Sequence, residues 1–596
     1  MIPPAAIYLA GLLAVPVLSG AARKTWVAGL GFLGLVAALL AGTGQPAGPY
    51  VFGPGIELVL FSVDPSRSFA GAVFAIAALL AILYSLHRDL PPVETMGILA
   101  SAGAAMGIVF AGDFITVFIF WELLALASLA IIWSAPGSGG SGFRYLLFHI
   151  FGGACLLTGS AIGVVASGST LLAPIGPGPQ YLLITIGIGV NAAFVPLHTW
   201  VPDAYPRASV AGTVALSIFT TKAAVFLLVV LGGWGQGLAY MGALMAVYGA
   251  VFALFQDDIR RVLSYSVISQ VGYMVAAVGT GSAMGTDAAL AHMTCDIVFK
   301  ALLFMAAGAV ILRTGISRMS RLGGLAKTMP LTAITAVVGG LALAGVPGLS
   351  GSVSKGMVIG AATEVPYLAP LLLFAAVVTV LYTSRFLWFV FFRKAPDNLG
   401  VRVEREAPVA MLAAMGIAAG FCILIGLFPD LLVSHLPGGS VAHPFSRTHL
   451  VESGAVLLAA GIVLLIAKPL RSPSGMVCET DIDRAYCAAG RAVAWTVKNP
   501  LSSGARGIDR MIGRIVSLAT RVSQNPVMTI RIWARTLALP FVRALLDPGH
   551  ADQFESALDG MRKRYPDERP GIRGSGYGLI LICIIAFLYY LLGAYA

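Results

Sequence analysis

The stretch AALAHMTCDIVFKALLFMAAG, residues 288–308, contains three ionisable side chains in a run that is otherwise largely apolar. A helix of about 20 apolar residues crosses the hydrocarbon core of a bilayer. His292, Asp296 and Lys300 follow one another at intervals of four residues, so such a helix carries all three on one face. Because a charged group in a bilayer is costly unless it is paired or hydrated, this face is a candidate functional site.

The composition of the chain is that of a membrane protein. Of its 596 residues, 58% are hydrophobic and 11% are charged, whereas soluble domains contain about 25% charged residues. This composition excludes a water-soluble enzyme and an intrinsically disordered chain.

Sixteen apolar runs are long enough to span a bilayer, which predicts an all-α polytopic membrane protein of about 16 transmembrane helices. The loops after odd-numbered runs hold most of the basic residues, so the positive-inside rule makes these loops cytoplasmic and places both termini on the opposite side. The runs are residues 3–22, 25–43, 67–86, 94–111, 114–133, 145–168, 180–200, 208–231, 238–256, 262–280, 286–312, 331–360, 367–392, 408–428, 450–467 and 575–595.

Three further charged residues lie in the middle of apolar runs, namely Glu122, Lys222 and Lys355. Histidine titrates near neutral pH, and burial shifts the pKa of lysine and carboxyl groups. Together with the charged face of 288–308, these residues therefore form a candidate proton path. The alternative is a static ion pair between Asp296 and Lys300 that only contributes to packing.

Two apolar runs contain helix breaks. Pro196 and Pro202 interrupt the seventh run, and Pro347 with neighbouring glycines and serines interrupts the twelfth. Broken helices expose backbone groups that bind water or ions, although a single proline is equally compatible with an ordinary kink. Since the breaks are five runs apart, we predict two five-helix repeats of opposite orientation.

The region after the fifteenth run differs from the rest, because stretches such as RIVSLATRV are amphipathic. They predict helices on the cytoplasmic face of the membrane, the alternative being a solvated tail. The predicted segments are 1–88 (N-terminal transmembrane helices), 89–234 (first repeat), 235–394 (second repeat), 395–470 (peripheral transmembrane helices), 471–574 (lateral amphipathic segment) and 575–596 (final transmembrane helix).

No motif indicates a cofactor held by this chain. Its six cysteines form no C-x-x-C pair, and the sequence has neither a P-loop nor a G-x-G-x-x-G after a strand-like run. We predict no cofactor, no metal site and no catalytic residues. Any redox chemistry would then belong to partner subunits, which leaves open whether the chain is part of an enzyme.

Five stretches resemble the antiporter-like membrane subunits shared by respiratory complex I, Mrp-type sodium/proton antiporters and membrane-bound hydrogenases. The region 188–226 looks closest to the D-type Mrp subunit, whereas the lateral segment and final span resemble the longest complex I member of this family. The five stretches are GDFITVFIFWELLALAS, PLHTWVPDAYPRASVAGTVALSIFTTKAAVF, DDIRRVLSYSVISQVGYM, HMTCDIVFKALLFMAAG and GGLAKTMPLTAITAVVGGLALAGVPGLSGSVSK.

The resemblance implies a proton path through the subunit. Glu122 matches a glutamate that pairs electrostatically with a lysine, and Lys222 matches a lysine of the first half-channel. Lys300 matches the central lysine, with His292 beside it, and Lys355 matches the lysine near the second break.

Two positions depart from the pattern of the family. Asn191 stands where many members have a lysine, so Glu122 must pair with Lys222 or with a group outside the chain. Asp296 stands where a histidine is common, and it would pair with Lys300 or bind a cation.

We therefore predict a proton-translocating subunit of a multisubunit complex, similar to the D-type Mrp subunit and with Na⁺/H⁺ exchange as one form of its activity. One alternative is a proton-pumping subunit of a redox-driven complex, resembling NADH-quinone oxidoreductase or a membrane hydrogenase. Another is an assembly subunit with an inactive channel. The predicted partners are other membrane subunits, H⁺, Na⁺ and lipid, with no nucleic acid, in the inner membrane of a bacterial cell.

Overall fold

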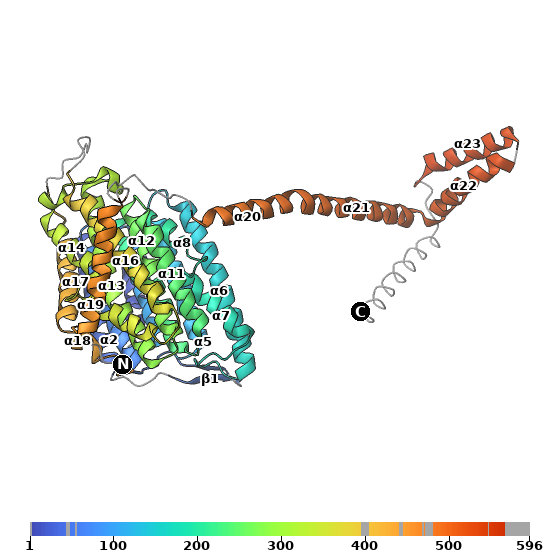
Figure 1. The fold of residues 1–596 in the computed structure, drawn as a ribbon. Helices are drawn as coiled ribbons and strands as arrows, with labels where there is room; N and C mark the ends of the chain where they lie inside the picture. Colours follow the sequence, from blue (N-terminus) through green and yellow to red (C-terminus); the bar gives the residue numbers. More distant parts are fainter. Residues whose placement is uncertain are drawn as a thin grey trace. The chain divides into compact units, whose positions relative to one another are not determined.

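Long apolar helices form most of the fold (Figure 1). The computed structural model describes residues 3–42, 48–53, 56–394, 405–439, 445–467, 470, 481–545 and 547–566. The chain divides into unit 1, Met1–Ile482, and unit 2, Asp483–Ala596. The finer predicted division into six segments remains a prediction.

Among the described residues, twelve helices are long and apolar enough to cross a membrane. The prediction of an all-α polytopic membrane protein is confirmed. The helices are α2 (Gly20–Ala41), α3 (Pro65–Ser85), α4 (Pro92–Phe110), α5 (Phe114–Trp133), α6 (Gly139–Ser167), α9 with α10 (Val210–Leu231), α11 (Gln236–Leu254), α12 (Ile259–Gly279), α13 (Ala283–Thr314), α16 with a π-helical turn (Leu368–Phe392), α17 (Val409–Leu427) and α19 (Arg447–Ile466).

The first predicted span, 3–22, is not one continuous helix. α1 covers Pro4–Gly11 and continues as a 3₁₀ turn over Leu12–Ala14. The helix ends there because Pro16, just beyond it, has no backbone N–H to donate to a further turn. The last predicted span, 575–595, lies outside the described residues.

Both predicted helix breaks are present. The run 180–200 forms α7 (Pro179–Asn191), an irregular segment and the short α8 (Trp200–Ala204). The run 331–360 forms α14 (Pro330–Ala344) and α15 (Ser350–Ala362). α14 ends at Gly345, which has a φ of 80° in the left-handed region that glycine adopts most easily.

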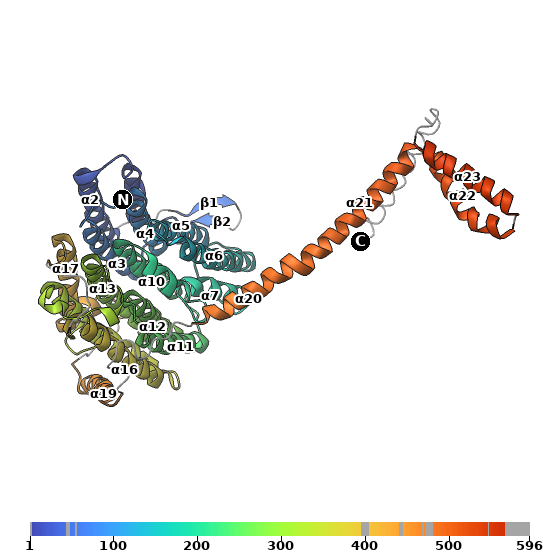
Figure 2. The same ribbon diagram turned by 90° about the horizontal axis from the view of Figure 1, so that it is seen from above.

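The two repeats have five membrane segments each, α4 to α10 and α11 to α16. In both repeats the third helix is long, 29 residues in α6 and 32 in α13, and the fourth segment is broken. Figure 2 shows α10, α12 and α13 inside unit 1, with α2, α6, α17 and α19 at its edge. α13 contacts helices of both repeats, including α9, α10, α12 and α15, so it connects the two halves.

Glycines bring α11 and α12 into very close contact. A Cβ atom on Gly272 would lie 2.4 Å from the Ala246 backbone nitrogen, and one on Gly242 would lie 2.2 Å from the Ala276 nitrogen. Small residues permit this approach of backbones, which is a common basis of helix association in membranes. α12 also packs against α13, the helix that carries the charged face.

We expect Gly272→Leu to destabilise unit 1 by about 1–3 kcal/mol or more, because the new side chain meets backbone rather than flexible atoms. The measurement is thermal unfolding of the detergent-solubilised protein. Gly416→Leu on α17 is the control, since a Cβ atom there has no neighbour within 4 Å. Equal melting temperatures for the two variants would contradict the explanation.

A small hairpin departs from the expected all-helical pattern. β1 (Tyr50–Gly53) pairs antiparallel with β2 (Ile56–Leu58) in the loop between α2 and α3. Thr170, which follows α6, donates its hydroxyl to the Glu57 carbonyl oxygen at 2.5 Å. The hairpin therefore fastens the start of α3 to the first repeat.

Unit 2 consists of helices in the region predicted to be amphipathic. They are α20 (Asp483–Thr496), a π-helical turn (Val497–Leu501), α21 (Ser502–Gln524), α22 (Pro526–Leu545) and α23 (Pro548–Arg564). α22 and α23 contact each other, with the Arg535 guanidinium 5.6 Å from the centre of the Phe554 ring. The location of these helices on the cytoplasmic face remains a prediction.

Candidate ion path

The charged face of α13 lies in the interior of unit 1. His292, Asp296 and Lys300 are each 0% exposed, as the helical spacing and apolar surroundings suggested. His292 Nδ1 lies 3.0 Å from Ser354 Oγ on α15, beside the second helix break. One end of the charged face therefore adjoins the broken helix of the second repeat.

The carboxylate of Asp296 pairs with Lys222 and not with Lys300. Lys222 Nζ lies 2.8 Å from Asp296 Oδ2, and both side chains are completely buried. The expected Asp296–Lys300 pair is absent because the Lys300 amino group instead donates to Ser266 Oγ on α12. The ion pair joins α10 of the first repeat to α13 of the second.

A local interruption between α9 (Val210–Ile218) and α10 (Thr220–Leu231) positions Lys222. Lys222 Nζ donates to the Ser217 carbonyl oxygen at 2.9 Å. The lysine thus satisfies both a backbone oxygen at the interruption and the Asp296 carboxylate.

Lys300 belongs to a second polar group. Its partner Ser266 Oγ lies 2.6 Å from the Tyr382 hydroxyl of α16. Ser266 falls within the stretch DDIRRVLSYSVISQVGYM, but no sequence pattern distinguishes Tyr382. The two residues are 116 positions apart and meet only in the folded protein.

Lys355 lies at the second helix break. Its Nζ donates to the Leu343 carbonyl oxygen at 2.6 Å, near the C-terminus of α14. The break at Gly345 and Pro347 leaves such carbonyl groups without helical partners, and the negative end of the helix dipole favours a cation there. Lys355 Nζ also lies 5.4 Å from the centre of the Tyr273 ring.

Glu122 has a different environment from the one the resemblance implies. It is half-buried on α5, and among the described residues it forms no ion pair with a lysine. Its side chain lies against Gly153 of α6, where a Cβ atom would come within 2.0 Å of Oε1. The expected Glu122–Lys222 pair is absent because Lys222 is held by Asp296.

A hydroxyl pair connects the helices that carry Glu122 and Lys222. Ser128 Oγ on α5 and Thr220 Oγ1 on α10 are 3.3 Å apart, and both residues are buried. Sequence reasoning did not identify them, because serine and threonine are common in membrane helices and only their contact is distinctive.

The first helix break surrounds Asn191, Pro196 and Pro202. Asn191 ends α7, is 0% exposed, and neither Nδ2 nor Oδ1 has a hydrogen-bond partner among the described residues. Trp200 Nε1 donates to the Val190 carbonyl oxygen at 2.8 Å and so bridges the break.

The carboxylate of Asp481 lies next to the first helix break, beside His198. His198 Nε2 lies 3.3 Å from its carboxylate, and the hydroxyls of Tyr248 and Tyr265 donate to it at 2.5 Å. Burial opposes ionisation of Asp481, but the hydrogen bonds from His198, Tyr248 and Tyr265 outweigh it and hold the pKa of this carboxyl below its ordinary value. Sequence reasoning missed the cluster, because Asp481 is 283 residues away from His198.

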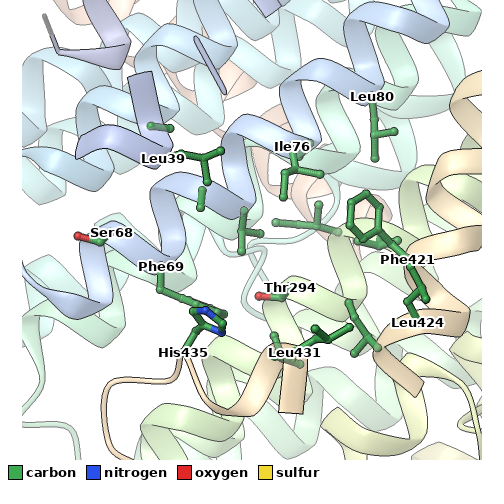
Figure 3. Close-up of a pocket in the computed structure, with 18 of the residues that line it drawn as sticks. Leu39, Ser68, Phe69, Ile76, Leu80, Thr294, Phe421, Leu424, Leu431 and His435 are labelled. Carbon is green, nitrogen blue, oxygen red and sulfur yellow. The ribbon is translucent and has the colours of Figure 1, made fainter. Parts of the chain in front are cut away.

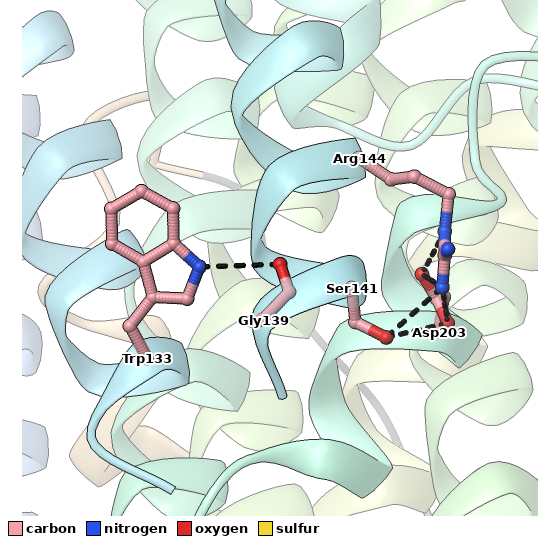
Figure 4. Close-up of polar contacts among 5 residues, drawn as sticks. All are labelled: Trp133, Gly139, Ser141, Arg144 and Asp203. Atoms are coloured by element: carbon pink, nitrogen blue, oxygen red, sulfur yellow. Dashed lines mark hydrogen bonds and ion pairs between the residues drawn. The ribbon is translucent and has the colours of Figure 1, made fainter. Parts of the chain in front are cut away.

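Figure 4 shows how the end of the first broken segment is held to α6. Arg144 donates from Nε and Nη2 to the two carboxylate oxygens of Asp203, both at 2.8 Å. Ser141 Oγ donates to Asp203 Oδ1 at 2.9 Å. This bidentate arrangement defines the position of α8 relative to α6.

Several buried polar atoms along the path have no hydrogen-bond partner among the described residues. Buried polar groups are nearly always paired with protein or with water, so these atoms are available to bind water along the path. The atoms include Glu122 Oε1, Asn191 Nδ2 and Oδ1, Thr221 Oγ1, Gln270 Oε1, His292 Nε2, Asp296 Oδ1 and Ser350 Oγ.

A separate apolar cavity of about 600 Å³ lies between α2, α3, α13 and α17 (Figure 3). Hydrocarbon side chains such as Leu39, Ile76 and Phe421 form most of its wall, with Ser68 and His435 among the few polar residues. None of the charged residues of the path lines it. The cavity is therefore distinct from the ion path.

Comparisons with known proteins agree with this geometry. Residues 111–383 match the family described as "NADH:quinone oxidoreductase/Mrp antiporter, TM". A probable K(+)/H(+) antiporter protein of Rhizobium meliloti (strain 1021) is 33% identical over 392 residues, which cover 60% of this chain but only 38% of that protein. "Hydrogenase-4 component B" of Escherichia coli (strain K12) is 26% identical, over 91% of this chain and 90% of that protein.

The fold is similar to that of a chain in the solved structure of the Mrp complex from Dietzia sp. DQ12-45-1b. The TM-score is 0.73 at 23% identity, over 90% of this chain and 66% of the other. The family match and the similarity to hydrogenase-4 component B confirm the predicted resemblance to antiporter-like membrane subunits, whereas a closer relationship to the D-type Mrp subunit stays a prediction. The match to the family described as "NADH:quinone oxidoreductase/Mrp antiporter, TM" covers residues 111–383, which contain the first break and most of the second repeat.

Proposed function

We propose that the chain is a proton-translocating membrane subunit of a multisubunit complex. The observation that carries the proposal is the buried ion pair between Lys222 and Asp296, because it connects the charged groups of the two inverted repeats. The proposed path consists of Glu122, Lys222, Asp296, Lys300, His292 and Lys355.

The geometry supports a switch between two ion pairs. Asp296 holds Lys222 at 2.8 Å, and Lys300 follows Asp296 one helical turn later on the same face. When Lys222 releases its proton, the Asp296 carboxylate loses its cation and becomes available to Lys300. One carboxylate thus serves two lysines in turn, and each exchange moves charge from the first repeat to the second.

The driving reaction separates two forms of this proposal. Similarity to a K(+)/H(+) antiporter protein supports an Mrp-type antiporter, in which H⁺ is exchanged for another cation such as Na⁺. The nearly end-to-end similarity to hydrogenase-4 component B specifically favours the second form, a subunit of a redox-driven complex. In that form the redox cofactors belong to partner subunits. We place either complex in a bacterial inner membrane, with both termini of this chain outside the cytoplasm.

Purification of the tagged chain in mild detergent, followed by mass spectrometry of the co-purifying proteins, tests the proposal. We expect several membrane subunits to accompany the chain. Partners with iron–sulfur, flavin or nickel sites would establish the redox-driven form, and small hydrophobic membrane subunits alone would establish the antiporter form. Recovery of the chain without any stoichiometric partner would contradict the proposal.

A further inference from the structure

A small polar cavity that Lys355 lines lies between α14, α15, α16 and α19. Its volume is about 30 Å³, which is room for one or two water molecules. The wall combines the second helix break with α16 and with the first turns of α19, outside the matched range 111–383. Its polar residues are Ser352, Lys355, His449, Glu452 and Ser453.

The contacts of His449 fasten α19 to the broken helix. His449 Nε2 lies 2.9 Å from Ser352 Oγ on α15, and Ser453 Oγ lies 3.4 Å from the same nitrogen. A Cβ atom on Gly356 would lie 2.5 Å from His449 Cε1, so the imidazole rests directly on α15. Glu452, less than one helical turn further along α19, lines the same cavity as Lys355.

The carboxylate of Glu452 forms no ion pair with any described residue, although it shares a water-sized cavity with a buried lysine. A half-buried carboxylate that forms no ion pair contributes no salt-bridge energy to the stability of the fold. The combination of a carboxylate, an imidazole, two hydroxyls and an ammonium around space for water is instead suited to proton transfer.

We propose that Glu452 and His449 form the port through which protons pass between Lys355 and the aqueous face where α19 begins. This inference rests on the proposed function. The proton leaves the Lys355 ammonium, crosses a bridging water and is taken up by the Glu452 carboxylate or the His449 imidazole. Ser352 orients the imidazole, and the first turn of α19, which is exposed except for the half-buried His449, provides the connection to solvent.

The test compares ion movement by the assembled complex in membrane vesicles for the wild type, Lys300→Ala, Lys355→Ala and the double variant His449→Ala/Glu452→Gln. We expect the double variant to lower the rate about tenfold or more, less than the loss of Lys355, because water can partly replace the port. Glu452→Asp should restore much of the rate. Arg447→Gln is the matched control, because Arg447 is exposed on the same first turn of α19.

Two results would overturn different claims. A double variant with the wild-type rate beside an inactive Lys355→Ala variant would overturn the port and leave the proposed function intact. Wild-type rates for both Lys355→Ala and Lys300→Ala would instead contradict the proposed function.

A second measurement covers the case in which the double variant fails to assemble. After replacement of the native cysteines, Ser453→Cys should react with a membrane-impermeant thiol reagent. Leu458 is 67% exposed in the middle of α19, on the outer, apolar side that a membrane span turns toward lipid. Leu458→Cys should therefore not react, because the reagent does not enter lipid. An unreactive Ser453→Cys would show that the cavity has no access to water and would overturn the port.

Discussion

Lys300→Ala is expected to reduce coupled ion movement by roughly a hundredfold or more, to the background rate of the vesicles. Lys300 is completely buried on the same face of α13 as Asp296, one helical turn beyond it. Its removal leaves Asp296 without a second cation, so the proposed exchange of ion pairs cannot occur. The measurement is the pH gradient formed by vesicles that contain the complete complex.

The same substitution should change assembly only slightly. Its former partner Ser266 retains its contact with the Tyr382 hydroxyl at 2.6 Å, so no uncompensated charge remains in α12 or α16. Lys327→Ala provides the control, because Lys327 is exposed in the loop before α14. A full pH gradient with Lys300→Ala at normal complex levels would contradict the proposed path and would favour an assembly subunit with an inactive channel.

Asp296→Ala is expected to be more damaging to the protein itself. It leaves the Lys222 ammonium buried with only the Ser217 carbonyl oxygen as a partner. Removal of one member of a buried ion pair costs about 3–5 kcal/mol, because the other charge remains without compensation. We therefore expect a large decrease in the amount of folded complex, measured by size-exclusion chromatography and thermal unfolding.

The double variant Lys222→Met/Asp296→Leu separates stability from transport. Replacing both charges with apolar side chains removes the desolvation cost, so folded complex should return to near the wild-type amount. Ion movement should stay at background, because the connection between the repeats is lost. Transport by this double variant would show that the ion pair is structural, and a stable Asp296→Ala variant would show that Lys222 is not held as a charge.

Sequence reasoning predicted the large elements of this protein well. The breaks around Pro196 and Pro347, the inverted repeats and the buried charges of 288–308 follow from length, composition and periodicity, which act locally along a helix. The first span was overestimated, because an apolar run continues past Pro16 although the helix does not. Asp481 and the Glu452 port were missed, because their significance depends on distant segments.

The sequence by itself determined that the protein is a membrane bundle, which side chains are charged within it, and that His292, Asp296 and Lys300 share one helix face. Only the tertiary structure decided which charges meet: Asp296 pairs with Lys222 across the repeats, and Lys300 turns to Ser266. The physical reason is that helical periodicity specifies directions around one axis. The partner of a buried charge is instead set by where helix packing and helix breaks bring a second chain segment within about 3 Å.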